Sequence, residues 1–311
     1  MGTVERVVLA FLKQSALVLG LIVLIAVLLL FSTPRMLMDS DHISNLVIQP
    51  VDETKNRYPI IVHHGILPFF TLHKFAKSLR QNGYAAYSTQ LSAANTPAYR
   101  ATELAAQIDI VLQSLGVSKV NIIAHSLGGL DARYLISSLG YQDKVASLTT
   151  YSTPHRGASI AELFYQKIPG FVFGMIDFYL ATAVDGSTWG AVDSQNCMAS
   201  LTPEYMQLEF NKNNKDRPEV FYQSWTGKAG YGTPKPYDPI NYFYGPYIYK
   251  HEGLNDGVVS VYSAEWGEFH DPILVGHAAQ IGRKSVFSPD WDYDPYAFYE
   301  SIAEGLAKKG F

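Results

Sequence analysis

The sequence predicts an α/β domain in which helices cover both faces of a mostly parallel sheet. Short, apolar, β-branched runs alternate with longer runs of helical periodicity, and glycines mark several of the junctions. The length of 311 residues suits one large domain with a single core. With 48% hydrophobic and 17% charged residues, the chain has the composition of a globular protein.

Three strand–helix pairs are expected after residue 58. In chain order they are a strand over 58–65, a helix over 70–81, a strand over 84–91, a helix over 99–115, a strand over 120–124 and a helix over 128–139. The first helix places Leu72, Phe75 and Leu79 at helical spacing before Gly83. Because parallel strands are joined by right-handed crossovers, their carboxyl ends meet at one edge, where such sheets collect functional sites.

Charge and cysteine content exclude several classes of protein. The formal net charge is -4, and basic residues run no further than a pair, as at Lys308–Lys309, so no nucleic-acid partner is expected. Cys197 is the only cysteine, so neither an intrachain disulfide nor a cysteine-based zinc cluster is available.

The N-terminus predicts a membrane segment. Residues 15–31 read SALVLGLIVLIAVLLLF without a charge, and as a helix they span roughly 25 Å, close to the hydrocarbon thickness. A cleavable signal peptide has an apolar region of only about 7–15 residues and an A-x-A-like site. Here the run ends in FSTP. We therefore interpret residues 1–33 as an uncleaved signal anchor, with a cleaved signal peptide as the alternative.

Flanking charges orient this segment. Arg6 and Lys13 precede it, whereas Asp39 and Asp41 follow it, so the positive-inside rule places the N-terminus in the cytoplasm. Residues 34–57 are predicted to form a polar tether, and residues 58–311 a globular domain on the periplasmic side. Cleavage would instead give a secreted protein.

Residues 124–129 read AHSLGG and join a predicted strand to a predicted helix. A serine hydroxyl is a weak nucleophile, so it must be exposed, aligned and deprotonated by a base as it attacks. A sharp strand–turn–helix junction lifts Ser126 above the sheet edge and requires small residues two positions away, here Ala124 and Gly128. The motif in this context predicts that Ser126 is a nucleophile.

Acyl transfer by a serine also needs N–H donors for the oxyanion. The N–H of Leu127 follows the nucleophile and lies at a predicted helix N-terminus, where negative charge is favoured. A second donor is expected from the loop after the first strand, where Ile66 follows His64-Gly65. The alternative is that His64-Gly65 simply closes the strand.

A base and an acid are expected downstream of Ser126, with the acid first. Asp256 lies in the turn NDGVV, and His277 lies 21 positions later, on a loop after a short strand expected over 273–275. Asp256 would hold the imidazole tautomer while His277 takes the serine proton.

Two other residues compete for these roles. His270, beside Asp271, is the alternative base, and Glu252 is the alternative acid. Taken alone, His277 would be interpreted as an ordinary surface histidine and Asp256 as an ordinary turn aspartate. The order of Ser126, Asp256 and His277 along the chain favours the triad.

Several motifs together resemble the bacterial triacylglycerol lipases of the Pseudomonas type, in the α/β-hydrolase superfamily. They are YPIIVHHG, NIIAHSLGGLDARYL, STPHRGA at 152–158, SLTPEYMQLEFN at 200–211, NDGVVS and the histidine loop, between about residues 58 and 282. The resemblance implies the α/β-hydrolase fold, a triad of Ser126, Asp256 and His277, and an oxyanion hole formed by Ile66 and Leu127. A folding chaperone is a candidate partner.

The chain also departs from that family. Its members usually carry a structural calcium ligated by an aspartate two residues after the catalytic histidine, and here that position is Ala279. Calcium prefers six to eight oxygen ligands, so we expect no such site or a weakened one, and no other cofactor. Residues 158–197 correspond to the lid of those lipases. The alternative for their apolar stretch FVFGMIDFYL is an ordinary buried helix.

The sequence therefore predicts a serine ester hydrolase that acts through an acyl-enzyme, with a triacylglycerol lipase as the first choice. A carboxylesterase, a phospholipase or another acyl hydrolase or acyltransferase is the alternative, because the triad sets the chemistry and the pocket sets the substrate. A non-catalytic binding module is the third hypothesis. The loss of a triad residue would favour it, and none is lost.

Overall fold

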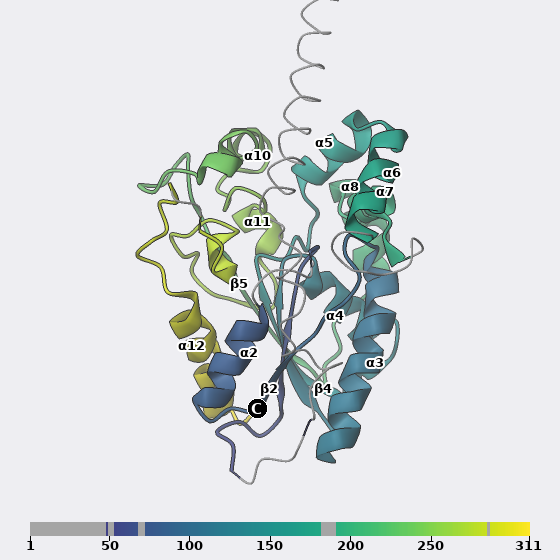
Figure 1. Cartoon of the computed structure of the whole chain (residues 1–311), viewed down its shortest axis with the longest axis vertical. Coiled ribbons are helices and arrows are strands. Elements are labelled where there is room, and N and C mark those ends of the chain that lie inside the picture. Colours follow the sequence, from purple (N-terminus) through teal and green to yellow (C-terminus); the bar gives the residue numbers. More distant parts are fainter. Residues whose placement is uncertain (1–47, 49–52, 68–71, 182–190, 285–286) are drawn as a thin grey trace, which may run out of the picture.

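The computed structural model describes residue 48 and residues 53–67, 72–181, 191–284 and 287–311 (Figure 1). The predicted signal anchor over 1–33 and most of the predicted tether lie outside the described residues. Among the helices of the described ranges, none is long and apolar enough to cross a membrane. The last tether residues pack on the domain, since the buried Asn56 exchanges hydrogen bonds with both the N–H and the C=O of Ala85.

The described part of the chain contains a six-stranded sheet in the order β2-β1-β3-β4-β5-β6, and all neighbours are parallel. Its strands are Ile60–His63 (β1), Ala86–Ser88 (β2), Val120–His125 (β3), Val145–Tyr151 (β4), Phe221–Trp225 (β5) and Glu268–Phe269 (β6). The predicted α/β fold class is confirmed. Strand β1 lies between β2 and β3, so the strand order reverses there, and such a switch point opens a crevice at the carboxyl edge.

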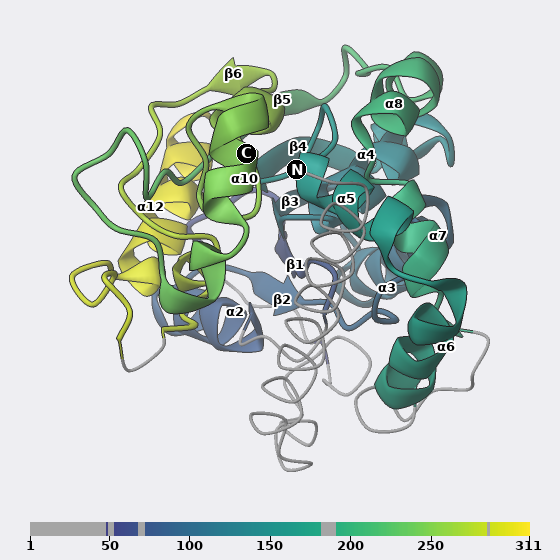
Figure 2. The same ribbon diagram turned by 90° about the horizontal axis from the view of Figure 1, so that it is seen from above.

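Helices flank the sheet on both faces. The longer ones are α2 (Leu72–Gln81), α3 (Pro97–Leu115), α4 (Gly128–Ser137), α5 (Ser159–Lys167), α6 (Gly170–Tyr179), α10 (Gly245–Glu252) and α12 (Pro295–Lys308). The short ones are η2 (Tyr141–Asp143), α7 (Ser194–Ala199), α8 (Pro203–Tyr205), η5 (Met206–Phe210), α9 (Asn211–Asn213), η6 (Pro239–Tyr242), α11 (Val261–Ala264) and η7 (Ala279–Ile281). Seen from above, α2 and α12 lie on one side of the sheet and α3 and α4 on the other (Figure 2).

Alternate residues of β1 supply two separate cores. Ile61 packs in one cluster with Leu104 of α3 and Leu135 of α4, whereas Ile60 and Val62 face the opposite cluster, which contains residues of α2 and α12. A parallel strand covered on both faces is apolar at every position, which explains the continuous run IIV. Both layers hold the carboxyl ends of β1 and β3 in place.

The strand expected over 273–275 is not formed, and this prediction was wrong. Ile273 makes only an isolated parallel bridge with Gly227. The N–H of Val275 donates to the carbonyl of Ile273 (2.9 Å), so the chain turns at once and the ladder cannot continue. The turn directs the following residues, Gly276 and His277, toward Asp256, whose carbonyl accepts the His277 N–H (2.9 Å).

Candidate active site

Ser126 lies at the turn between β3 and α4, and its φ of 56° is in the left-handed region. Residues other than glycine rarely adopt this conformation, so the surrounding contacts must hold it. The Ser126 N–H donates to the carbonyl of Tyr151 (2.9 Å), and the Ser126 carbonyl accepts from Thr153 Oγ1 (2.7 Å). Strand β4 and the residues after it therefore stabilise the strained turn.

Close backbone contacts explain why glycine occupies two positions around Ser126. A Cβ on Gly128 would stand 2.6 Å from the carbonyl oxygen of His64, and one on Gly65 would stand 2.9 Å from Ser126 Cβ. Neither contact can be relieved by rotating a flexible side chain. The loop after β1 therefore lies directly against the serine turn.

The structure brings Ser126, His277 and Asp256 into one hydrogen-bonded chain. Ser126 Oγ lies 3.1 Å from His277 Nε2, and His277 Nδ1 lies 2.7 Å from Asp256 Oδ2. Because an ionised carboxylate only accepts, Nδ1 carries the imidazole proton and Nε2 accepts from the serine hydroxyl. This arrangement suits a serine that transfers its proton to a histidine while it attacks.

Asp256 is completely buried yet well paired. Its Oδ1 accepts from the N–H groups of Val258 (3.0 Å) and Val259 (2.8 Å), and its Oδ2 accepts from Gln280 Nε2 (2.9 Å) as well as from His277. Burial alone would raise the pKa of this carboxyl, but the adjacent His277 and these hydrogen bonds outweigh burial and lower it. The carboxylate therefore stays ionised at neutral pH.

The two expected oxyanion donors flank the serine. Leu127 directly precedes α4, and Ile66 follows Gly65, which contacts Ser126. Within the described ranges, neither backbone N–H is paired with a protein acceptor. Two N–H groups left unpaired beside a nucleophile, one of them at a helix N-terminus, are suited to stabilise negative charge on a bound carbonyl oxygen.

This geometry agrees with comparisons to known proteins. Residues 58–191 match the family model of the alpha/beta hydrolase fold. The solved structure of a metagenomic carboxyl esterase superposes with a TM-score of 0.65 at 16% sequence identity, covering 85% of this chain and 79% of that one. The chain therefore has the α/β-hydrolase fold.

Proteins of similar sequence include lipases. It is 29% identical over 287 residues to a triacylglycerol lipase of Vibrio cholerae, across 83% of this chain and 90% of that protein. It is 32% identical over 126 residues to a triacylglycerol lipase of Pseudomonas fragi, across 38% of this chain and 42% of that protein. The predicted resemblance to bacterial lipases is thus confirmed, while the Pseudomonas match is confined to a smaller part of the chain.

The rival residues lie in other contacts. His270 stacks on Trp225 with ring centroids 3.9 Å apart, and its Nε2 lies 3.1 Å from Gln223 Oε1. Glu252 accepts from the N–H of Ser159 (2.6 Å) and from Ser260 Oγ (2.6 Å), so it links α10 to α5. Neither residue joins the hydrogen-bonded chain of Ser126.

Two residues near the triad were not singled out from the sequence. Gln280 donates to Asp256, and the ring of the buried His125 lies 4.6 Å from the His277 ring. Burial lowers the pKa of His125 well below its usual value, and the adjacent His277 lowers it further, so His125 is neutral at pH 7. His125 lies within AHSLG, which was the only sequence signal for it.

Two positions near His277 bear on the calcium site that we expect to be absent or weakened. Ala279 offers only a buried methyl group where a ligand is expected. Asp290 accepts the Gly276 N–H (3.2 Å) through one oxygen and pairs with Lys235 Nζ (3.0 Å) through the other. In the part of the chain that the structure describes, no group of three or more His, Cys, Asp or Glu side chains is arranged to hold a metal ion.

Helix α6, within the predicted lid, has one packed face and one exposed apolar face. Phe171, Met175 and Phe178 are 73%, 64% and 50% exposed. On the other side, Ile176 packs in the same cluster as Ile66, which lies in the loop after β1, hereafter the oxyanion loop. The helix therefore differs from an ordinary buried helix, and it packs against the same buried cluster as the loop that carries one of the two expected oxyanion donors. In Figure 1, α5, α6 and α10 all lie at the upper end of the molecule.

Proposed function

We propose that this protein is a serine carboxylic-ester hydrolase and that triacylglycerols are its preferred substrates. The observation that carries the proposal is the continuous hydrogen-bonded chain from Ser126 through His277 to Asp256. The similarity to triacylglycerol lipases of Vibrio cholerae and Pseudomonas fragi supports an acylglycerol substrate.

The proposed reaction proceeds in two acyl-transfer steps. Ser126 Oγ attacks the ester carbonyl while His277 Nε2 takes its proton, and the N–H groups of Ile66 and Leu127 stabilise the tetrahedral oxyanion. The oxyanion collapses, the C–O bond to the alcohol breaks, and His277 returns the proton to the leaving alcohol. Water then attacks the acyl-enzyme with His277 again as base, which releases the fatty acid and Ser126. The ionised Asp256 stabilises the imidazolium formed in both steps.

We also propose that α6 acts as a lid that contacts lipid. A soluble protein rarely leaves contiguous large apolar side chains in water without a function for them. Phe171, Met175 and Phe178 recur at helical spacing on the exposed face. Movement of α6 onto a lipid surface would bury these side chains and alter the packing of the cluster that Ile176 and Ile66 share.

For its location, we propose that residues 1–33 anchor the enzyme in a membrane with the catalytic domain on the periplasmic side. The uncharged apolar run and the asymmetric flanking charges support this. Intact mass analysis of the membrane fraction tests it: an uncleaved chain supports the anchor, and a shortened soluble chain contradicts it.

Hydrolysis of p-nitrophenyl esters from acetate to palmitate, together with emulsified triolein, tests the enzymatic proposal. We expect the wild-type protein to be active, with a rate maximum at long acyl chains, and Ser126→Ala to be inactive. A maximum at short chains, without hydrolysis of triolein, would identify a carboxylesterase. Wild-type protein that hydrolyses no ester would refute the proposal.

A further inference from the structure

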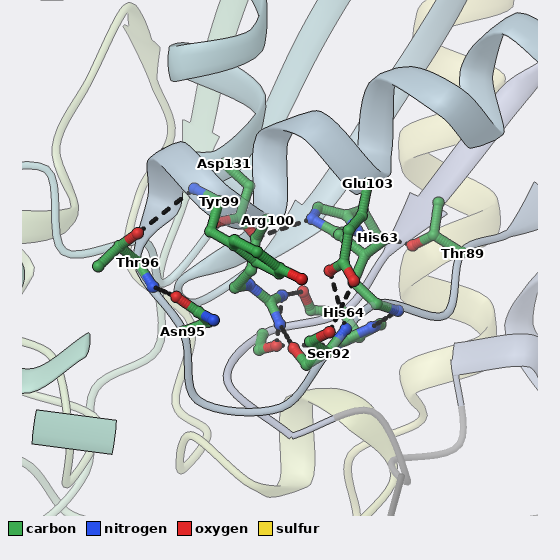
Figure 3. Close-up of polar contacts among 12 residues, drawn as sticks. His63, His64, Thr89, Ser92, Asn95, Thr96, Tyr99, Arg100, Glu103 and Asp131 are labelled. Atoms are coloured by element: carbon green, nitrogen blue, oxygen red, sulfur yellow. Dashed lines mark hydrogen bonds and ion pairs between the residues drawn. The ribbon is translucent and has the colours of Figure 1, made fainter. Parts of the chain in front are cut away.

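Arg100 of α3 is a completely buried cation beside the loop that follows β1 (Figure 3). Its Nε donates to Asp131 Oδ2 (2.8 Å), its Nη1 donates to the carbonyl of Ser92, and its Nη2 donates to the carbonyls of Gly65 (2.8 Å) and His64 (3.1 Å). Burying a guanidinium is costly unless its N–H groups are paired. Here the charge is directed at the backbone of the oxyanion loop.

The hydrogen bond from Arg100 to the Gly65 carbonyl acts on the Ile66 N–H, the expected oxyanion donor, through a single peptide unit. The carbonyl of Gly65 and the N–H of Ile66 belong to the same planar trans peptide, so they point in opposite directions. Fixing the carbonyl on Arg100 Nη2 therefore fixes the direction of the Ile66 N–H. A hydrogen bond from a cation is also stronger than a neutral one, and it polarises the peptide so that its N–H becomes a better donor.

His64 acts on the same carbonyl oxygen. Its Nε2 accepts the N–H of Leu91 (2.8 Å), so Nε2 is unprotonated and the proton lies on Nδ1. His64 Nδ1 then donates to the Gly65 carbonyl (2.8 Å). The oxygen of the Gly65–Ile66 peptide thus accepts hydrogen bonds from two buried side chains.

The neighbouring segment 91–94 completes this support. The N–H of Ala94 donates to the carbonyl of Ile66 (2.8 Å), and Ser92, whose carbonyl accepts from Arg100, donates through its N–H (3.0 Å) and its Oγ (2.6 Å) to Glu103. The carbonyls of Gly65 and Ile66, which flank the Ile66 N–H along the backbone, therefore both accept hydrogen bonds. Figure 3 shows Arg100, His64, Ser92 and Glu103 gathered in this cluster.

We propose that Arg100 and His64 are positioning residues that aim and polarise the Ile66 N–H toward the oxyanion formed on Ser126. The inference rests on the proposed ester hydrolysis. Both residues act through the Gly65–Ile66 peptide rather than by touching substrate. Since negative charge on the carbonyl oxygen develops in the transition state, their loss lowers kcat more than it changes KM.

The test compares Arg100→Lys with wild type on p-nitrophenyl butyrate. Lysine keeps the charge, but its ammonium group cannot reproduce the planar guanidinium that donates to both Asp131 and the carbonyls of the oxyanion loop. We expect kcat to fall about 10- to 100-fold, somewhat less than the loss of a whole oxyanion donor, with KM changed by less than about threefold. The inhibition constant of butaneboronic acid, which forms a tetrahedral adduct on serine, rises by a similar factor.

Arg133→Lys is the matched control. Arg133 is also buried, but it binds Asn211 Oδ1 (2.8 Å) and the carbonyl of Asn214 (3.0 Å), away from the oxyanion loop. We expect this variant to lose thermal stability as Arg100→Lys does, while it keeps wild-type kcat and boronate affinity. If Arg100→Lys does not fold, His64→Phe removes one donor to Gly65 and carries the same expectation.

The outcomes separate the two proposals. Arg100→Lys with wild-type kcat, in an enzyme that Ser126→Ala inactivates, overturns the positioning role and leaves the hydrolase intact. Equal losses of kcat and boronate affinity in the Arg100 and Arg133 variants reveal a general structural effect and also overturn the role. Absence of ester hydrolysis in the wild-type protein overturns the proposed function itself.

Discussion

Asp256 combines complete burial with four hydrogen bonds to its carboxylate, from Val258, Val259, His277 and Gln280. Its lowered pKa keeps it ionised, so it fixes the His277 tautomer and stabilises the imidazolium without taking the proton. The residue orients the base and does not react itself.

Asp256→Asn should therefore harm activity less than loss of the reacting residues. We expect kcat on p-nitrophenyl butyrate to fall about 10⁴-fold for Asp256→Asn, and about 10⁶-fold for Ser126→Ala or His277→Ala. Steady-state kinetics on the three variants measure the order. Wild-type turnover in Asp256→Asn would show that this carboxylate does not serve His277.

At the residue scale, the sequence singled out residues that the structure brings together where the proposed role has a local signature. Ser126 lies in a strand–turn–helix motif, and Asp256 and His277 follow it in the expected order; the structure joins all three. Gln280 and Arg100 have no such signature, because their contacts form only on folding. Arg100 is 35 positions from Gly65, and neither residue lies in a pattern that points to the other.

At the scale of elements, the junction of β3 with α4 depends on close approach of the loop after β1. Gly128→Ala would place a methyl group 2.6 Å from the His64 carbonyl oxygen, so the loop or the helix must shift. We expect kcat to fall roughly 10- to 100-fold, since small misplacements of reacting groups have effects of that size. Ester hydrolysis and thermal unfolding measure the change.

Gly305→Ala is the control for this substitution. Gly305 lies in α12 with nothing within 4 Å of an added Cβ, so alanine should stabilise the helix by about 0.5–1 kcal/mol without affecting kcat. Full activity in Gly128→Ala would contradict the close approach of the two segments.

The exposed face of α6 makes a separate prediction. We expect Phe171→Ser, Met175→Ser and Phe178→Ser together to lower the rate on emulsified triolein about tenfold, because lipid contact loses three large apolar side chains. The rate on soluble p-nitrophenyl acetate should stay unchanged. Ile110→Ser, on the exposed side of α3, is the control and should leave both rates unchanged. Equal loss on both substrates would argue against a role in lipid contact.

The elements that the sequence predicted are those with apolar patterns. Strands β1 and β3 and helices α3 and α4 appear within a few residues of their expected bounds. No strand was assigned over β4, whose residues VASLTTY are all buried although several are polar. Ser147 Oγ donates to Asn121 Oδ1 (2.7 Å), and Thr149 Oγ1 accepts from Gln223 Nε2 (2.8 Å). These hydrogen bonds satisfy the buried polar side chains, so the strand lacks the apolar pattern by which the other strands were predicted.

At the scale of the whole molecule, buried neutral histidines link stability to pH. Burial is the main cause that lowers the pKa of His63, His125 and His155 well below the usual value. The unfolded chain binds protons at these residues below about pH 6.5, whereas the folded protein does not. The stability they provide is therefore complete above about pH 6.5 and is lost as the pH falls.

Urea unfolding between pH 7.5 and 5.5 measures this linkage. We expect the free energy of unfolding to decrease by up to about 1.4 kcal/mol per pH unit for each of the three histidines. The His155 ring contacts Thr150, Arg133 and Trp266 rather than a triad residue, so His155→Gln should reduce the slope by about one third while leaving ester hydrolysis intact. A flat profile would contradict the burial of these histidines in their neutral form.

The central claim is that Ser126 is an activated nucleophile, and covalent labelling tests it most directly. The wild-type protein is treated with a fluorophosphonate, and its peptides are analysed by mass spectrometry. We predict one adduct per chain, located on Ser126, absent in Ser126→Ala and formed far more slowly in His277→Ala. An adduct on another residue, or no adduct on the folded wild-type protein, would contradict the account.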